Sequence, residues 1–233
     1  MIGFDPMYFV FVLPAMLLGF WAQYKVKSAF AEGKTIRANC GLSGAQVAKQ
    51  ILDANSISNV GIERTDGYLG DHYDPKAKVL RLSPDVFDGY SISALGVAAH
   101  EVGHAIQDAQ KYTPLVIRNG IVPLASIGST ASFILMMLGA VLNAFNLVLL
   151  GIAAFSLIVF FQLINLPVEF DASNRARSIL LKTGIVNSNE EKEVGKVLNA
   201  AALTYVAATL TSVLTLVYYL YRFGLLGSSR DDD

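Results

Sequence analysis

Four long apolar segments constrain the fold of this chain more than any other feature of its sequence. None of them contains Asp, Glu, Lys or Arg, and each approaches the roughly 20 residues that a helix needs to cross a bilayer. They occupy residues 7–24, 121–142, 147–168 and 201–221. This pattern predicts a mainly α membrane protein with four transmembrane helices, the second and third forming a tight hairpin.

The composition agrees with this class and excludes several others. Apolar residues make up 53% and charged residues 16% of the chain, whereas soluble domains have about 45–50% and about 25%. So apolar a chain is not intrinsically disordered, and its single cysteine, Cys40, excludes an intrachain disulfide framework. The net charge of −1 gives no general attraction to nucleic acid, so no nucleic-acid partner is expected.

The distribution of Lys and Arg predicts the side of the membrane on which each connecting segment lies. Residues 25–118 carry 11 of the 18 basic residues and residues 169–200 carry five, which leaves Arg222 and Arg230 for the other side. Because basic connecting segments are retained in the cytoplasm, both segments are expected there. The expected order is an N-terminal transmembrane anchor (1–24), a cytoplasmic domain (25–118), a transmembrane hairpin (119–168), a cytoplasmic segment (169–200), and a last transmembrane helix with an acidic tail (201–233).

The cytoplasmic domain has the pattern of a small α+β unit. Residues 43–55 have helical apolar spacing with Ser43 as the expected N-cap, and residues 91–110 predict a longer helix capped by Ser91 or Ser93. Strands are expected at residues 60–64 and 78–82, and the Asp-His-Tyr-Asp-Pro stretch at 71–75 is typical of a loop.

The longer helix carries the motif His-Glu-x-x-His at His100, Glu101 and His104. Residues four apart lie on one helix face, so both imidazoles can bind one metal ion, and imidazole suits Zn²⁺. Glu101 stands beside the first ligand, where it can act as general base on a zinc-activated water and then as proton donor to a leaving amine. The motif therefore predicts a zinc cofactor and makes 25–118 a zincin-like domain.

A catalytic zinc needs a third protein ligand, and three residues are candidates. Glu169 follows the third apolar segment directly, so the topology returns it to the side and membrane depth of the motif helix. His72 would be a good ligand from the 71–75 stretch. Asp108, four residues after His104, could bind the metal or accept a hydrogen bond from an imidazole.

Other residues near these motifs have candidate roles in substrate binding. Residues 79–82 are a candidate edge strand to which a peptide substrate could add, with an ordinary core strand as the alternative. His72 and Tyr73 are candidates for stabilising an oxyanion, with loop packing as the alternative. Arg175 and Arg177 are candidates for orienting Glu169 or a substrate carboxylate, with anchoring at lipid head groups as the alternative.

Five sequence stretches give the chain a family resemblance: GLSGAQVAKQIL (41–52), GDHYDP (70–75), VLRLSPDVF (79–87), AAHEVGHAIQ (98–107) and LPVEFDASNRA (166–176). With them the chain resembles, over nearly its whole length, the YugP-like neutral zinc metallopeptidases of bacterial membranes. It is more distantly similar to the HtpX and CAAX-prenyl-protease class of membrane gluzincins. In that class a glutamate downstream of the membrane hairpin is the third zinc ligand, which implies Glu169 here. That class usually has Asp four residues later, where this chain has Ser173, and Asp171 is a candidate replacement.

These expectations combine into a multi-pass zinc endopeptidase of the bacterial inner (plasma) membrane, with its active site facing the cytoplasm. Its expected partners are the lipid bilayer and membrane-associated or unfolded polypeptide substrates, and a homo-oligomer or a membrane protein partner is compatible with the sequence. The alternative is a non-catalytic membrane scaffold or partner protein that retains a metal site. A protease with its motif inside a membrane helix is disfavoured because Gln107, Asp108, Gln110 and Lys111 follow the motif.

Overall fold

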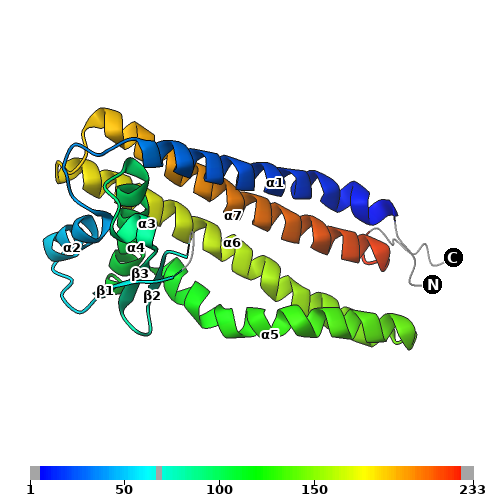
Figure 1. Ribbon diagram of the computed structural model, residues 1–233. Coiled ribbons are helices and arrows are strands. Elements are labelled where there is room, and N and C mark those ends of the chain that lie inside the picture. The colour runs from blue at the N-terminus through cyan, green and yellow to red at the C-terminus, as the bar shows by residue number, and fades with distance from the viewer. Residues whose placement is uncertain (1–5, 67–69, 227–233) are drawn as a thin grey trace. The chain divides into compact units, whose positions relative to one another are not determined.

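The computed structural model describes residues 6–66 and 70–226, and the acidic tail at 231–233 lies outside the described residues. Most of the chain is helical, with one small sheet (Figure 1). In chain order the elements are α1 (Pro6–Thr35), α2 (Gly44–Ala54), β1 (Gly61–Arg64), β2 (His72–Asp74), β3 (Val79–Leu82), α3 (Pro84–Phe87), α4 (Ile92–Ala109), α5 (Thr113–Val141), α6 (Phe145–Lys182) and α7 (Ser188–Arg222).

The four expected apolar helices are present as α1, α5, α6 and α7, and all four are long and apolar enough to cross a membrane. Each extends beyond the apolar run that predicts it. Helix α7, for example, begins at Ser188 with Glu190 and Glu191 in its first turn, a favourable place for acidic side chains because of the helix dipole. An apolar run therefore marks the segment suited to lipid and does not mark the ends of the helix.

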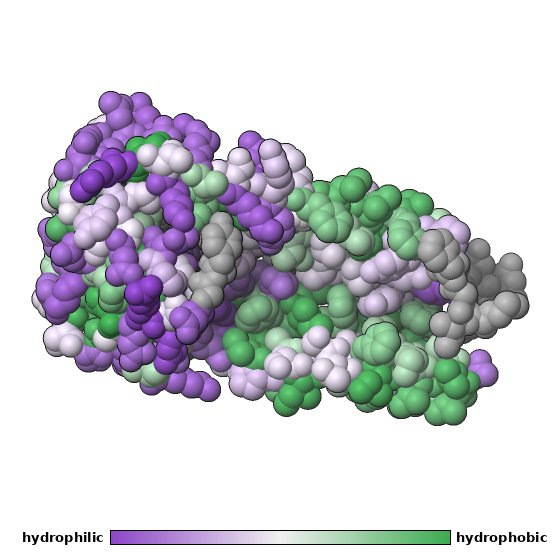
Figure 2. Space-filling model, viewed as in Figure 1, coloured by the Kyte–Doolittle hydropathy of each residue, from purple (hydrophilic) through white to green (hydrophobic). Residues whose placement is uncertain are grey.

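One compact unit holds the described residues of Met1–Trp21, Ile117–Leu166 and Tyr205–Asp233. Its neighbouring helices are fixed by side-chain contacts, with the Tyr8 and Tyr218 rings 5.1 Å apart between α1 and α7 and the Phe155 and Tyr219 rings 5.3 Å apart between α6 and α7. Hydrophobic residues cover much of the visible face of this unit (Figure 2). Large apolar side chains such as Ile127, 69% exposed, point outward, as expected of helices that face lipid.

The second unit comprises Ala22–Val116 and Pro167–Thr204, and its sheet has the order β1-β3-β2. Strand β3 pairs in parallel with β1 and antiparallel with β2. Of the two alternatives for residues 79–82, the core strand is confirmed, because these residues form the central strand and not an edge. The loop expectation for 71–75 is wrong. That stretch contains strand β2, because backbone pairing with β3 overrides its loop-like composition.

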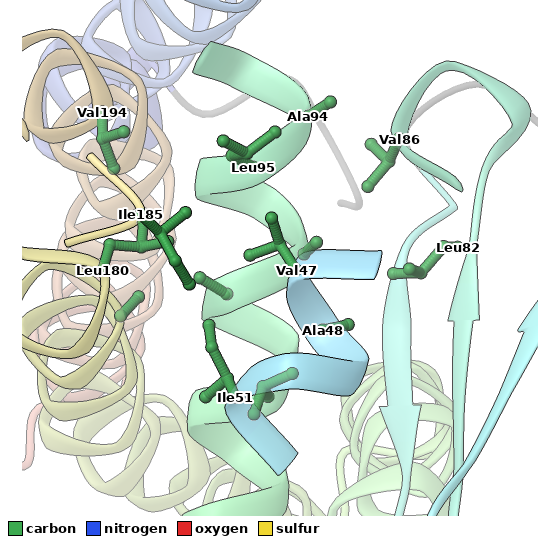
Figure 3. Close-up of a cluster of buried hydrophobic side chains, with 14 of the residues drawn as sticks. Val47, Ala48, Ile51, Leu82, Val86, Ala94, Leu95, Leu180, Ile185 and Val194 are labelled. Atoms are coloured by element: carbon green, nitrogen blue, oxygen red, sulfur yellow. The ribbon is translucent and has the colours of Figure 1, made fainter. Parts of the chain in front are cut away.

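Helix α4 is the central helix of this unit. Its N-cap is Ser91, whose hydroxyl accepts a hydrogen bond from the Ala94 backbone N–H, while the Ser93 hydroxyl donates to the Phe30 carbonyl of α1. Side chains of α2, the β3–α3 segment, α6 and α7 surround Leu95 and Ala94 (Figure 3). Because most of α4 is buried, the side chains of its zinc motif are held by packing on several sides.

Candidate metal centre

The two motif histidines face the same side of α4. Their ring centroids lie 4.8 Å apart with the planes at 83°, as the four-residue spacing on one helix face requires. His104 is 8% exposed and Glu101 is 7% exposed. The motif is therefore largely removed from solvent. In such a buried position a charge without a compensating partner is costly.

Glu169 of α6 completes a group with these histidines. Its Oε2 lies 3.4 Å from His100 Nε2 and 3.6 Å from His104 Nε2. This oxygen is buried and has no hydrogen-bond partner in residues 6–66 and 70–226. A buried carboxylate oxygen without a donor is expensive to maintain unless a cation is meant to occupy the space beside it.

The separations fit a zinc ion. Bonds of about 2.0–2.1 Å to tetrahedral ligands place neighbouring ligand atoms about 3.3 Å apart, close to the two observed N···O distances. The ligand atoms of His100, His104 and Glu169 all lie within 4.8 Å of one another. Two imidazole nitrogens and one carboxylate oxygen are also a donor set typical of catalytic zinc.

The remaining ring nitrogen of each histidine has its own polar partner. His100 Nδ1 lies 3.1 Å from Ser173 Oγ, and His104 Nδ1 lies 3.0 Å from Gln107 Oε1. When Nδ1 carries the proton in such a pair, the Nε2 lone pair is free for a metal. Ser173 occupies the position where the membrane gluzincins usually have Asp, and it is this hydroxyl that contacts His100.

Neighbouring carboxylates alter the protonation of the site. Burial alone would lower the pKa of His104, but the Glu169 and Glu101 carboxylates outweigh burial and raise the pKa of this imidazole above its ordinary value. Burial raises the pKa of Asp71, hydrogen bonds from Ser83 oppose that rise, and the nearby Glu101 carboxylate adds to it. The site thus concentrates negative charge that a bound cation would offset.

The other two candidate ligands lie outside this group. His72 is exposed, and its Nδ1 lies 2.8 Å from the Gly70 carbonyl oxygen. Asp108 accepts a hydrogen bond from the Tyr73 hydroxyl at 2.6 Å and pairs with Lys78. Within the described residues, only Glu169 joins the two motif histidines as a potential metal ligand.

Three further residues were assigned candidate roles from sequence. Asp171 accepts hydrogen bonds from Gln107 and Arg175, whereas the Nδ1 partners of the two imidazoles are Gln107 and Ser173. Arg175 therefore orients Asp171, and Arg177 pairs with Glu191. The hypothesis that these arginines orient Glu169 has no contact to support it in the part of the chain that the structure describes.

Sequence reasoning missed two residues of the site. Gln107 is fully buried and touches His104, Val168 and Asp171, and Asp71 binds Ser83 near Glu101. Gln107 stands three residues after His104 on the same helix face, which is a spacing signal for a residue that supports a candidate ligand. Asp71 had no comparable signal, because its approach to α4 depends on the sheet.

Comparison with known proteins supports this interpretation of the geometry. A family described as "Putative neutral zinc metallopeptidase" matches residues 8–224. The chain belongs to this family. It is 49% identical over 218 residues to "Putative membrane protease YugP" of Bacillus subtilis (strain 168). The aligned region covers 93% of this chain and 97% of the relative. No solved structure matches the chain. Members of this neutral zinc metallopeptidase family are thus expected to bind zinc, and the group formed by His100, His104 and Glu169 suits that metal.

Proposed function

We propose that this chain is a membrane zinc endopeptidase of the gluzincin type, in which His100, His104 and Glu169 bind zinc and Glu101 is the general base. One observation carries the proposal. The Glu169 Oε2 atom is buried without a hydrogen-bond partner among the described residues and lies beside two imidazole Nε2 atoms. The family membership supports the peptidase activity.

The proposed chemistry assigns one proton-transfer role to Glu101. Bound zinc would polarise the scissile carbonyl and lower the pKa of a water molecule in the site. The Glu101 carboxylate takes a proton from that water while the water oxygen adds to the carbonyl carbon. Glu101 then delivers the proton to the amide nitrogen, the C–N bond breaks, and a carboxylic acid and an amine leave. Glu101 is 7% exposed, so this proton exchange would take place largely away from bulk water.

The proposed location is the cytoplasmic face of the bacterial inner (plasma) membrane. Support comes from the 16 of 18 basic residues in segments 25–118 and 169–200 and from the four apolar helices. These two segments supply nearly all of the second unit. A reporter fused after residue 226 would read out the opposite side, and a cytoplasmic signal there would contradict the topology.

The proposed substrates are membrane-associated or unfolded polypeptides bound as an added strand. In the described sheet β2 is an edge strand, and its Tyr73 contacts Asp108 on the motif helix. An extended peptide beside β2 would gain backbone hydrogen bonds and lie near the zinc ligands of α4. N-methylation of single amides in a peptide inhibitor should weaken binding at alternate positions. Uniform tolerance of N-methylation would contradict strand addition.

The decisive experiment compares Glu101→Gln with the unmodified chain in detergent micelles. The variant should keep its zinc and lose casein cleavage, because the amide cannot accept the proton. Equal cleavage by both forms would contradict the mechanism and favour the non-catalytic alternative.

A second set of variants tests the ligand assignment. Glu169→Ala and His104→Ala should lower zinc occupancy, because each removes one of three protein ligands. His72→Ala is the matched control, since His72 is the third histidine of the chain and is exposed outside the group. Loss of zinc in His72→Ala with retention in Glu169→Ala would transfer the third ligand to β2.

A further inference from the structure

Gln107 has an unusual position for an uncharged polar side chain. It is fully buried on α4, and every polar atom of its amide has a partner. The amide nitrogen donates to the Val168 carbonyl oxygen and to Asp171 Oδ2, both at 2.8 Å. The amide oxygen lies 3.0 Å from His104 Nδ1.

The partners of Gln107 determine the direction of each hydrogen bond. A backbone carbonyl and a carboxylate can only accept, so they must face the two N–H donors of the amide. The amide oxygen is then left for His104, and an oxygen without hydrogen can only accept. His104 must therefore donate from Nδ1, which leaves the Nε2 lone pair facing Glu169.

The same amide also forms hydrogen bonds with the segment that carries the third ligand. Val168 precedes Glu169 on α6, and Asp171 follows it by two residues, so the two N–H groups of Gln107 bind on either side of Glu169. Asp171 is fixed in turn by Arg175, whose Nη1 donates to Oε1 of Gln110, the residue directly after α4, at 2.7 Å. A continuous set of hydrogen bonds thus joins the end of α4 to α6.

We infer that Gln107 is a positioning residue of the zinc site, which couples the tautomer of His104 to the position of the α6 segment that carries Glu169. One side chain from α4 thereby prepares two ligands from different helices for the same ion. This inference rests on the proposed zinc site but not on peptidase activity. It predicts that metal affinity, and not only stability, depends on the direction of the Gln107 hydrogen bonds.

The test measures zinc affinity of the metal-free full chain in micelles by competition with a chelator. Gln107→Met keeps the size of the side chain and removes all three hydrogen bonds. The expected dissociation constant for zinc rises about 10- to 100-fold, the usual effect of losing a partner of a metal-binding histidine. Cobalt(II) substituted for zinc should show altered visible absorption, because the ligand geometry changes. Gln50→Met, at an exposed position of α2 outside these hydrogen bonds, is the matched control and should change the zinc dissociation constant less than about twofold.

A second variant tests the inference even if Gln107→Met fails to fold. Gln107→Glu retains an acceptor for His104 but loses both donors and places a negative charge beside Asp171. It should bind zinc more weakly. Adding Asp171→Asn should restore part of the affinity, because the amide at position 171 can then donate to the carboxylate at position 107.

Two results would overturn the inference. One is a zinc affinity and cobalt spectrum of the Gln107 variants equal to those of the unmodified chain. The other is a double variant that binds zinc no more tightly than Gln107→Glu alone. Absence of zinc binding by the unmodified chain would instead refute the metal site under "Proposed function", so the two failures are distinguishable.

Discussion

Gly103 of α4 lies directly against the backbone of Ala172 of α6. A Cβ atom at position 103 would stand 2.7 Å from the Ala172 carbonyl oxygen and 3.1 Å from its Cα. Both are backbone atoms, which cannot move aside as a flexible side chain can. The glycine inside the zinc motif therefore permits the close helix approach that brings Glu169 toward the two histidines.

Gly103→Ala should weaken zinc binding by forcing α6 away from α4. Overpacking of this kind costs about 1–3 kcal/mol, and the displaced Glu169 should raise the zinc dissociation constant at least about tenfold. Chelator competition and thermal unfolding measure the two effects. Gly120→Ala is the control, because a Cβ at Gly120 meets no atom within 4 Å. Equal zinc affinity in both alanine variants would show that the close approach does not set the site.

Ser173 gives a second prediction, because its hydroxyl is the partner of His100 Nδ1. Ser173→Ala should weaken zinc binding about 10-fold or more, since the imidazole loses the group that orients it. Ser173→Asp should bind zinc at least as tightly as the unmodified chain, because a carboxylate accepts the same hydrogen bond more strongly. Zinc titration of the three forms measures the order. Tighter binding by Ser173→Ala than by Ser173→Asp would contradict this role.

The sequence was sufficient to predict the features that depend on local pattern. The apolar runs predict α1, α5, α6 and α7, and Ser91 was one of two expected caps for α4. The spacing of His100 and His104 also requires their proximity on any helix. Such features depend on a few neighbouring residues, so one sequence carries them.

Features that depend on contacts between distant segments were not predictable in the same way. The placement of β3 between β1 and β2 follows from tertiary pairing, which no run of four residues encodes. The role of Gln107 likewise requires Val168 and Asp171, more than 60 residues away in the chain. Spacing alone left three candidates for the third ligand, and only the family resemblance pointed to Glu169, which the helix packing brings beside the histidines.

Zinc affinity should fall with decreasing pH over a range set by His104. The metal binds the neutral imidazole, and the raised pKa of His104 means that protons begin to compete above the ordinary value, about 6.5. Below that pKa the apparent affinity should drop up to about tenfold per pH unit for each competing proton. Glu101→Gln removes one charge that raises this pKa, so its affinity curve should shift to lower pH. Chelator competition between about pH 5.5 and 8 measures both curves, and coincident curves would exclude this contribution of Glu101.

Tyr73→Phe should act on stability more than on catalysis. The hydroxyl donates to Asp108, and burial together with the Asp108 carboxylate raises the pKa of Tyr73, so the phenol remains a protonated donor at neutral pH. Removing a hydrogen bond to a charged group costs about 1.5–3 kcal/mol, and the partial exposure of Asp108 and its contact with Lys78 reduce this to roughly 1 kcal/mol. Thermal unfolding of the metal-free chain should register that loss, whereas zinc affinity should be unchanged.

If Tyr73 instead stabilises an oxyanion, kcat on a peptide substrate should fall about 10²–10³-fold. With its hydroxyl committed to Asp108, we expect a decrease in kcat of less than about tenfold.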